Sequence, residues 1–146
     1  MIWAAPKLSP EVLALWQVKP TNGPKKYSIN NHPNLLTPYM QDLYQAFRKE
    51  VLSLDPCVTE EFLKFYVAYK AETNFVDIIP LTKFMRLMLN MPFADIKDPK
   101  GICRDVTGLG RWGNGDIELE LRTIDELPYI MSLVRQSFES QMNDEK

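Results

Sequence analysis

The chain has 146 residues, of which 45% are apolar, so it is long enough for one domain with a substantial core. Its charged residues amount to 25% and its formal net charge is −2, which excludes a strongly basic nucleic-acid-binding protein and leaves only a local basic patch as a route to nucleic acid. Two cysteines exclude a disulfide scaffold, and no apolar run reaches the roughly 18 residues of a membrane-spanning helix. We therefore expect a cytoplasmic protein with no membrane contact.

The first 34 residues are predicted to form an arm and linker ahead of a single domain over residues 35–146. Ser9 followed by Pro10 is typical of a helix start and predicts a short helix that ends near Gln17. Prolines and asparagines then favour an irregular linker up to residue 33. The single histidine, His32, lies in this linker with no acid or nucleophile near it in sequence, so we do not expect it to be catalytic.

Periodicity predicts one helix and three strands in the next part of the chain. Thr37-Pro38 marks a helix start, and apolar residues at spacings of three and four continue to Val51. Alternating residues then predict strands over 64–70, 75–79 and 84–89, which we expect to form an antiparallel meander.

The last part of the domain is predicted to contain an irregular glycine-rich segment, a strand and a closing helix. Residues 102–106 are expected to form one helical turn, and the alternation over residues 116–121 predicts a strand. A capping box at residues 123–126 predicts the closing helix, although Pro128 would then remove one of its backbone hydrogen bonds. The order of elements indicates a two-layer α+β fold, in which an antiparallel sheet of about four to five strands carries two main helices on one face, with an N-terminal arm that holds a short helix.

The glycine-rich segment GLGRWGNG is the first candidate binding site. It lacks the Lys-Ser/Thr of a P-loop, and it precedes a strand where a dinucleotide fingerprint would follow one. Its backbone N–H groups could bind an anion beside an arginine, and its tryptophan could stack on a base; the alternative is a crossing whose tryptophan closes the core edge. The candidate ligand- or partner-binding residues in and around this segment are Arg104, Asp105, Arg111, Trp112, Asn114 and Asp116.

The outer face of the sheet is a second candidate surface. Inward positions of the predicted strands are apolar, whereas the outward positions mix basic, aromatic and methionine side chains, as at an interaction surface; these are Lys64, Tyr66, Lys70, Phe75, Asp77, Phe84, Arg86 and Met88. The N-terminal arm could equally cover this face. Asp116, Glu118 and Glu120 also share one face by the strand period, and we interpret them as a solvated row and not as a magnesium site.

Three segments, KFYVAYKAETNFVDIIP, DPKGICRDVTGLGRWGNGD and MSLVRQSF, resemble a bacterial domain of unknown function. That family occurs in so-called predicted transport proteins and as a C-terminal appendage of restriction-like or ParB-like nuclease proteins. The resemblance covers about residues 27–140, and its Tyr69-Lys70 motif adds these two residues to the candidate binding residues. This chain differs from the family pattern at Arg111, where the pattern has histidine, and at Pro128, where the pattern has no proline. The resemblance implies a link to bacterial or phage defence nucleases without a nuclease in this chain.

These observations favour a non-catalytic interaction module. Serine and cysteine nucleophiles have no histidine partner apart from His32, and no residue pattern indicates a metal or cofactor, so an enzyme is disfavoured. We expect a protein partner, with nucleic acid as the second class of ligand, and the sequence leaves open whether the chain is a monomer or a dimer. The alternative is a small-molecule or nucleotide-binding protein, or an enzyme, with a pocket formed by the loops at residues 98–116.

Overall fold

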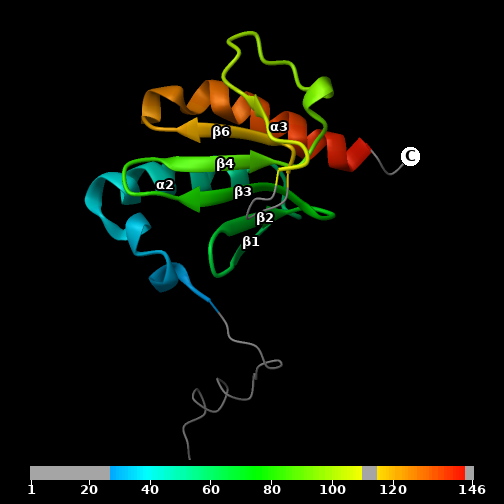
Figure 1. Cartoon of the computed structure of the whole chain (residues 1–146). Coiled ribbons are helices and arrows are strands. Elements are labelled where there is room, and N and C mark those ends of the chain that lie inside the picture. Colours follow the sequence, from blue (N-terminus) through cyan, green and yellow to red (C-terminus); the bar gives the residue numbers. More distant parts are fainter. Residues whose placement is uncertain (1–26, 110–114, 144–146) are drawn as a thin grey trace, which may run out of the picture.

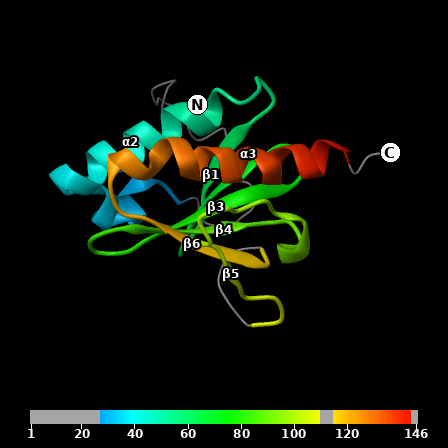
Figure 2. The same cartoon turned by 90° about the horizontal axis from the view of Figure 1, so that it is seen from above.

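The computed structural model describes residues 27–109 and 115–143 and shows a two-layer α+β domain. An open, fully antiparallel sheet forms one layer, and the helices α2 (Pro38–Leu52) and α3 (Leu127–Asn143) form the other (Figure 1). Both helices cross the same face of the sheet (Figure 2). The predicted α+β class is confirmed, while the short helix predicted near Ser9 lies outside the described residues.

The sheet has six strands in the order β1-β2-β3-β4-β6-β5, where four or five were expected. The strands are β1 (Thr59–Phe62), β2 (Val67–Lys70), β3 (Asn74–Pro80), β4 (Met85–Leu89), β5 (Arg104–Asp105) and β6 (Ile117–Leu121). The meander over β2, β3 and β4 is confirmed, and β6 pairs with β4 along its whole length.

Two sequence predictions about strands were wrong. The strand predicted over residues 64–70 starts only at Val67, because a tight turn joins it to β1, in which the Leu63 N–H donates to the Tyr66 carbonyl at 2.8 Å. The helical turn predicted over residues 102–106 is instead the two-residue strand β5, which pairs with the first half of β6. A local hairpin turn thus shortens β2, whereas at β5 pairing with the more distant β6 outweighs local preference.

Both helices begin as their sequences predict. Pro38 occupies the first turn of α2, where its missing N–H costs no intrahelical hydrogen bond. Thr123 and Glu126 form the predicted capping box, but around a short 3₁₀ helix over Ile124–Glu126 that precedes α3. Pro128 is therefore the second residue of α3, so it also lies in a first turn and removes no hydrogen bond. None of the helices in the described part of the chain has the length and apolar character needed to cross a bilayer.

The main core lies between the sheet and the two helices. Ile117, Leu119 and Leu121 face it as predicted, together with alternate residues of β2, β3 and β4. Phe75 also lies in this core, edge-on to Phe138 with the ring centroids 5.3 Å apart, so its predicted outward position was wrong. A register irregularity between Tyr69 and Lys70 accompanies this change of face.

The outer face of the sheet is not open at its centre. Met88 packs there in a separate apolar cluster with Ile79 and Val106, and Met88 is fully buried. Asp77 is also fully buried and accepts a hydrogen bond from the Asn74 amide at 2.9 Å. Of the two expectations for this face, an exposed interaction surface was therefore wrong for this part of the sheet, while residues 1–26 of the N-terminal arm, which was the alternative cover for this face, lie outside the described residues.

His32, which was assigned to the linker, packs onto the domain. It is 5% exposed, and its Nε2 lies 2.7 Å from the carbonyl oxygen of Leu63 in the β1–β2 turn. Leu35, the third residue of the next short helix and the first residue of the predicted domain, is fully buried. Burial lowers the pKa of His32, although the hydrogen bond to the Leu63 carbonyl works against it.

Because His32 is buried, we expect the domain to become less stable as the solution becomes acidic. Between the lowered pKa of folded His32 and its ordinary value near 6.5, the unfolded chain binds more protons than the folded chain, so the free energy of unfolding falls as the pH drops below about 6.5. The slope from one proton is at most about 1.4 kcal/mol per pH unit. Thermal melts of the wild type and of His32→Gln between pH 7.5 and 5.5 test this. Equal pH profiles for the two proteins would contradict it, and the result is simple to assign because the chain has one histidine.

Candidate ligand-binding site

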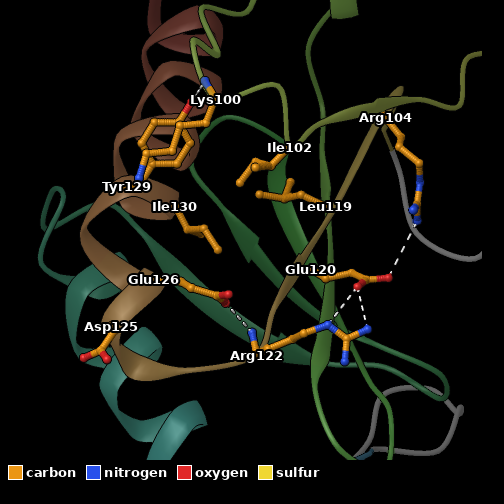
Figure 3. A pocket seen from close by; sticks show the side chains of 10 residues that line it. All are labelled: Lys100, Ile102, Arg104, Leu119, Glu120, Arg122, Asp125, Glu126, Tyr129 and Ile130. Carbon is orange, nitrogen blue, oxygen red and sulfur yellow. Dashed lines mark hydrogen bonds and ion pairs between the residues drawn. The ribbon is translucent and has the colours of Figure 1, made fainter.

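A pocket of about 420 Å³ lies between the C-terminal half of β6, the start of α3 and the segment that leads into β5 (Figure 3). Its apolar lining comes from Ile102, Leu119 and Ile130, one residue from each of these three elements. Charged side chains and one tyrosine complete the lining, namely Lys100, Arg104, Glu120, Arg122, Asp125, Glu126 and Tyr129. The three cations and three carboxylates leave the pocket balanced in charge.

The backbone of β6 borders this pocket along an edge that is only partly paired. β5 pairs with Ile117 and Glu118 of β6. Because Arg104, which pairs with Glu118, is the first residue of β5, the ladder does not extend to the following residues of β6. Even-numbered residues of β6 direct their N–H and C=O groups toward this edge, because the Val106 N–H bonds the Asp116 carbonyl and backbone direction alternates along a strand. Glu120 therefore presents one donor and one acceptor to the pocket, and no hydrogen bond within the described residues occupies either of them.

The next even-numbered residue, Arg122, has both of its backbone groups occupied. Its N–H donates to the Glu126 carboxylate at 2.7 Å, and its carbonyl accepts from the Tyr39 hydroxyl of α2. The capping box that starts α3 thus also closes the end of the β6 edge. Among residues 27–109 and 115–143, none is hydrogen-bonded to the Glu120 backbone, which lies between β5 on one side and this closure on the other.

The wall opposite β6 is held against α3 by two sets of hydrogen bonds. Asp98 accepts from the Tyr129 hydroxyl and, at 2.8 Å, from the Cys103 N–H. Two turns further along α3, the Gln136 amide both accepts from the Lys97 N–H and donates to the Lys97 carbonyl, each at 2.8 Å. These bonds hold the segment before β5 away from β6, so the pocket is a fixed feature of the fold.

Cys103 in this wall is not an activated nucleophile. Burial and the nearby Asp98 carboxylate raise the pKa of the Cys103 thiol to about 12, so it is protonated at neutral pH. Hydrogen bonds from Tyr129 and Cys103 outweigh burial and lower the pKa of Asp98, which keeps this carboxylate ionised as an acceptor. In the described part of the chain, no three His, Cys, Asp or Glu side chains are grouped closely enough to hold a metal ion.

Glu118 and Glu120 of β6 do not form a solvated row with Asp116, contrary to prediction. Glu118 is 1% exposed, and its Oε2 lies 2.8 Å from Arg86 Nε and 2.5 Å from an Arg104 guanidinium nitrogen. Glu120 is half-buried and accepts two hydrogen bonds from Arg122, at 3.1 and 2.7 Å. Arg86 of β4 and Arg104 of β5 thus pair with Glu118, whereas Arg122, just after the end of β6, pairs with Glu120.

The structure brings together only some of the predicted binding residues. Arg104 lines the pocket, and Asp105 follows it on β5 but turns to bond Thr107. Asp116 lines a different hollow near the other end of α3. Arg111, Trp112 and Asn114 lie outside the described residues.

The remaining two candidates, Tyr69 and Lys70, lie at the far side of the sheet. Tyr69 is fully buried in the main core, where its hydroxyl donates to Glu60 at 2.7 Å. Lys70 forms an exposed ion pair with Glu61 at 2.6 Å. Neither residue reaches the pocket beside β6.

Sequence reasoning missed most of the residues that line the pocket. Lys100, Arg122 and Tyr129 come from a turn, a strand end and a helix start that are separated in sequence. The predicted capping box was the one available signal, because it places Glu126 and the next residues of α3 beside the end of β6.

A second polar cluster lies under α2, on the core face of the sheet. The Glu60 carboxylate of β1 accepts from the Tyr44 hydroxyl at 2.6 Å, from the Tyr69 hydroxyl at 2.7 Å and from Arg48 Nε at 3.0 Å. Burial, strengthened by the hydrogen bond to Glu60, raises the pKa of Tyr44 far above its usual value. Every partner of this carboxylate is a donor, so the cluster serves packing of α2 on β1 and β2.

Comparisons with known proteins support one assignment. An uncharacterised protein of Haemophilus influenzae is 35% identical to this chain over 113 residues, which are 77% of this chain and 37% of that protein. The chain thus spans little more than a third of the length of this relative. No solved structure matches the chain. The model of the family "Domain of unknown function (DUF5655)" matches residues 34–141, which include α2, all six strands and α3 up to residue 141. The chain belongs to the DUF5655 family.

Proposed function

We propose that this domain is a non-catalytic interaction module that binds a segment of a partner protein in the pocket between β6 and α3. The observation that carries the proposal is the composition of this pocket, in which an apolar lining of three side chains is surrounded by equal numbers of cations and carboxylates. Binding sites for protein segments combine an apolar centre with a polar rim in this way. The family resemblance suggests that the partner belongs to a bacterial or phage defence system that includes a nuclease.

The charge balance favours a protein segment over nucleic acid. Glu120, Asp125 and Glu126 would lie close to any phosphate bound by the cations of the same pocket, and Arg104 and Arg122 already pair with carboxylates. Nucleic-acid sites instead concentrate cations along the path of the phosphates. Among the described residues that line the pocket there is no histidine, cysteine or serine, which excludes a Ser-His or Cys-His nucleophile pair within this lining.

Selection of random 12-residue peptides on the immobilised full chain tests this proposal. We expect enriched peptides to bind the wild type and Leu36→Glu, but to lose at least about tenfold in affinity for Ile102→Glu, which places a charge in the apolar lining. Leu36 is the matched control, because it is an exposed apolar residue (43%, against 39% for Ile102) on a short helix outside the pocket. Calorimetric titration measures the three affinities.

Two results would contradict the proposed function. Enriched peptides that bind Ile102→Glu as tightly as the wild type would place the site elsewhere. A melting shift with short DNA or RNA that is lost in Ile102→Glu, without any enriched peptide, would assign the pocket to nucleic acid.

A further inference from the structure

The backbone N–H and C=O of Glu120, which no other described residue occupies, point to the conformation of the bound segment. Both groups point into the pocket, whereas the same groups of Glu118 are covered by β5 and those of Arg122 are bonded to Glu126 and Tyr39. A donor and an acceptor on one strand residue match the C=O and N–H of one residue in a second extended chain. We propose that the occupant is a short extended peptide segment that continues the sheet at this point, with one of its residues paired to Glu120; this inference rests on the proposed function.

The strand period then fixes where the side chains of this segment go. The residue paired with Glu120 shares the outer face of the sheet with the Glu120 side chain, since paired residues lie on one face. The residues on either side of it point to the opposite face, where Ile102, Leu119 and Ile130 line the pocket. The segment is therefore expected to carry an apolar residue next to the paired one.

The fold around this edge accommodates a short segment and excludes a long strand. On one side of Glu120, the edge is covered by β5, which begins at Arg104. On the other side, the Arg122 N–H is bonded to the Glu126 carboxylate. Arg104 and Arg122, both bonded to β6 carboxylates, lie on the same outer face. Charged side chains on an edge strand oppose unlimited pairing between copies of a protein. The opening thus admits a single pair of backbone hydrogen bonds.

The test uses synthetic versions of an enriched peptide, each with one N-methylated backbone amide, titrated into the full chain. We expect one position to lose about tenfold or more in affinity, because N-methylation removes the donor to the Glu120 carbonyl, while the two neighbouring positions change little. The residues at those neighbouring positions should be apolar, and their replacement by alanine should weaken binding. In ¹⁵N spectra, the amide signal of Glu120 should shift on binding and exchange more slowly with solvent.

The outcomes separate this inference from the function on which it rests. If all N-methylated peptides bind alike and the Glu120 amide is unchanged, strand pairing is overturned, while loss of binding in Ile102→Glu still supports a pocket for a protein segment. If no peptide is enriched, or if enriched peptides ignore Ile102→Glu, both are overturned.

Discussion

Replacing Glu60 by alanine is expected to lower the free energy of unfolding by about 2–5 kcal/mol, because two buried tyrosine hydroxyls lose their acceptor at a cost of about 1–3 kcal/mol each. Tyr44 and Tyr69 are 1% and 0% exposed, so water cannot replace the carboxylate without opening the core. Arg48 adds less, since its side chain is 41% exposed and can return to solvent. Urea unfolding and thermal melting measure the loss, which should lower the Tm by about 10 °C.

Two further variants show whether the tyrosine hydroxyls left without an acceptor cause this loss of stability. Adding Tyr44→Phe and Tyr69→Phe to Glu60→Ala should restore part of the stability, because burying two apolar groups costs less than burying two unpaired polar ones. Glu61→Ala is the matched control on the same strand, where an exposed ion pair with Lys70 contributes at most about 1 kcal/mol. Equal losses for Glu60→Ala and Glu61→Ala would contradict the explanation.

Replacing Gly115 by alanine is expected to cost about 2–3 kcal/mol, at the upper end of the usual range for overpacking. A Cβ atom at this position would lie 2.6 Å from the Leu89 carbonyl oxygen and 2.9 Å from its carbon. These are backbone atoms of β4, a central strand that is paired on both sides, so they cannot move away without disturbing the sheet. The free energy of unfolding in urea measures the effect.

Gly108→Ala is the matched control within the same glycine-rich segment. A Cβ at Gly108 would meet no atom within 4 Å, but its φ of +82° is unfavourable for alanine, at a cost of about 1–2 kcal/mol. Gly115→Ala should therefore be the more destabilising change. The reverse order, or equal losses, would show that contact with β4 does not set the need for glycine at position 115.

The fold could be predicted where local pattern and tertiary structure agree. The stripe that begins at Pro38, the alternation of Ile117, Leu119 and Leu121, and the capping box at Thr123 each appear in the structure. The hairpin between β1 and β2 could not be predicted, because its turn over residues 63–66 has no glycine or proline and alternation continues through it. β5 is two residues long and depends entirely on pairing with β6.

The candidate site was harder to predict because its chemistry depends on partners from other strands. Glu118 and Glu120 are equivalent in the local pattern, yet Glu118 is buried because Arg86 and Arg104 lie on either side of it in the sheet. Arg104 was identified as a binding residue, whereas Lys100 and Arg122 reach the same pocket only through tertiary structure. A sequence pattern indicates which face a side chain takes, but not which charges it meets there.

The order of strands also governs how the domain assembles. β1 to β4 are neighbours in both sequence and sheet, so this meander can form from local contacts, whereas β6 must close a loop over residues 90–116 to reach β4. β5 has β6 as its sole neighbour and can join only after it. We therefore expect the edge beside the pocket to be completed last in folding and to open first from the native state. A segment bound there would slow that opening, so a partner would extend the kinetic lifetime of the folded domain.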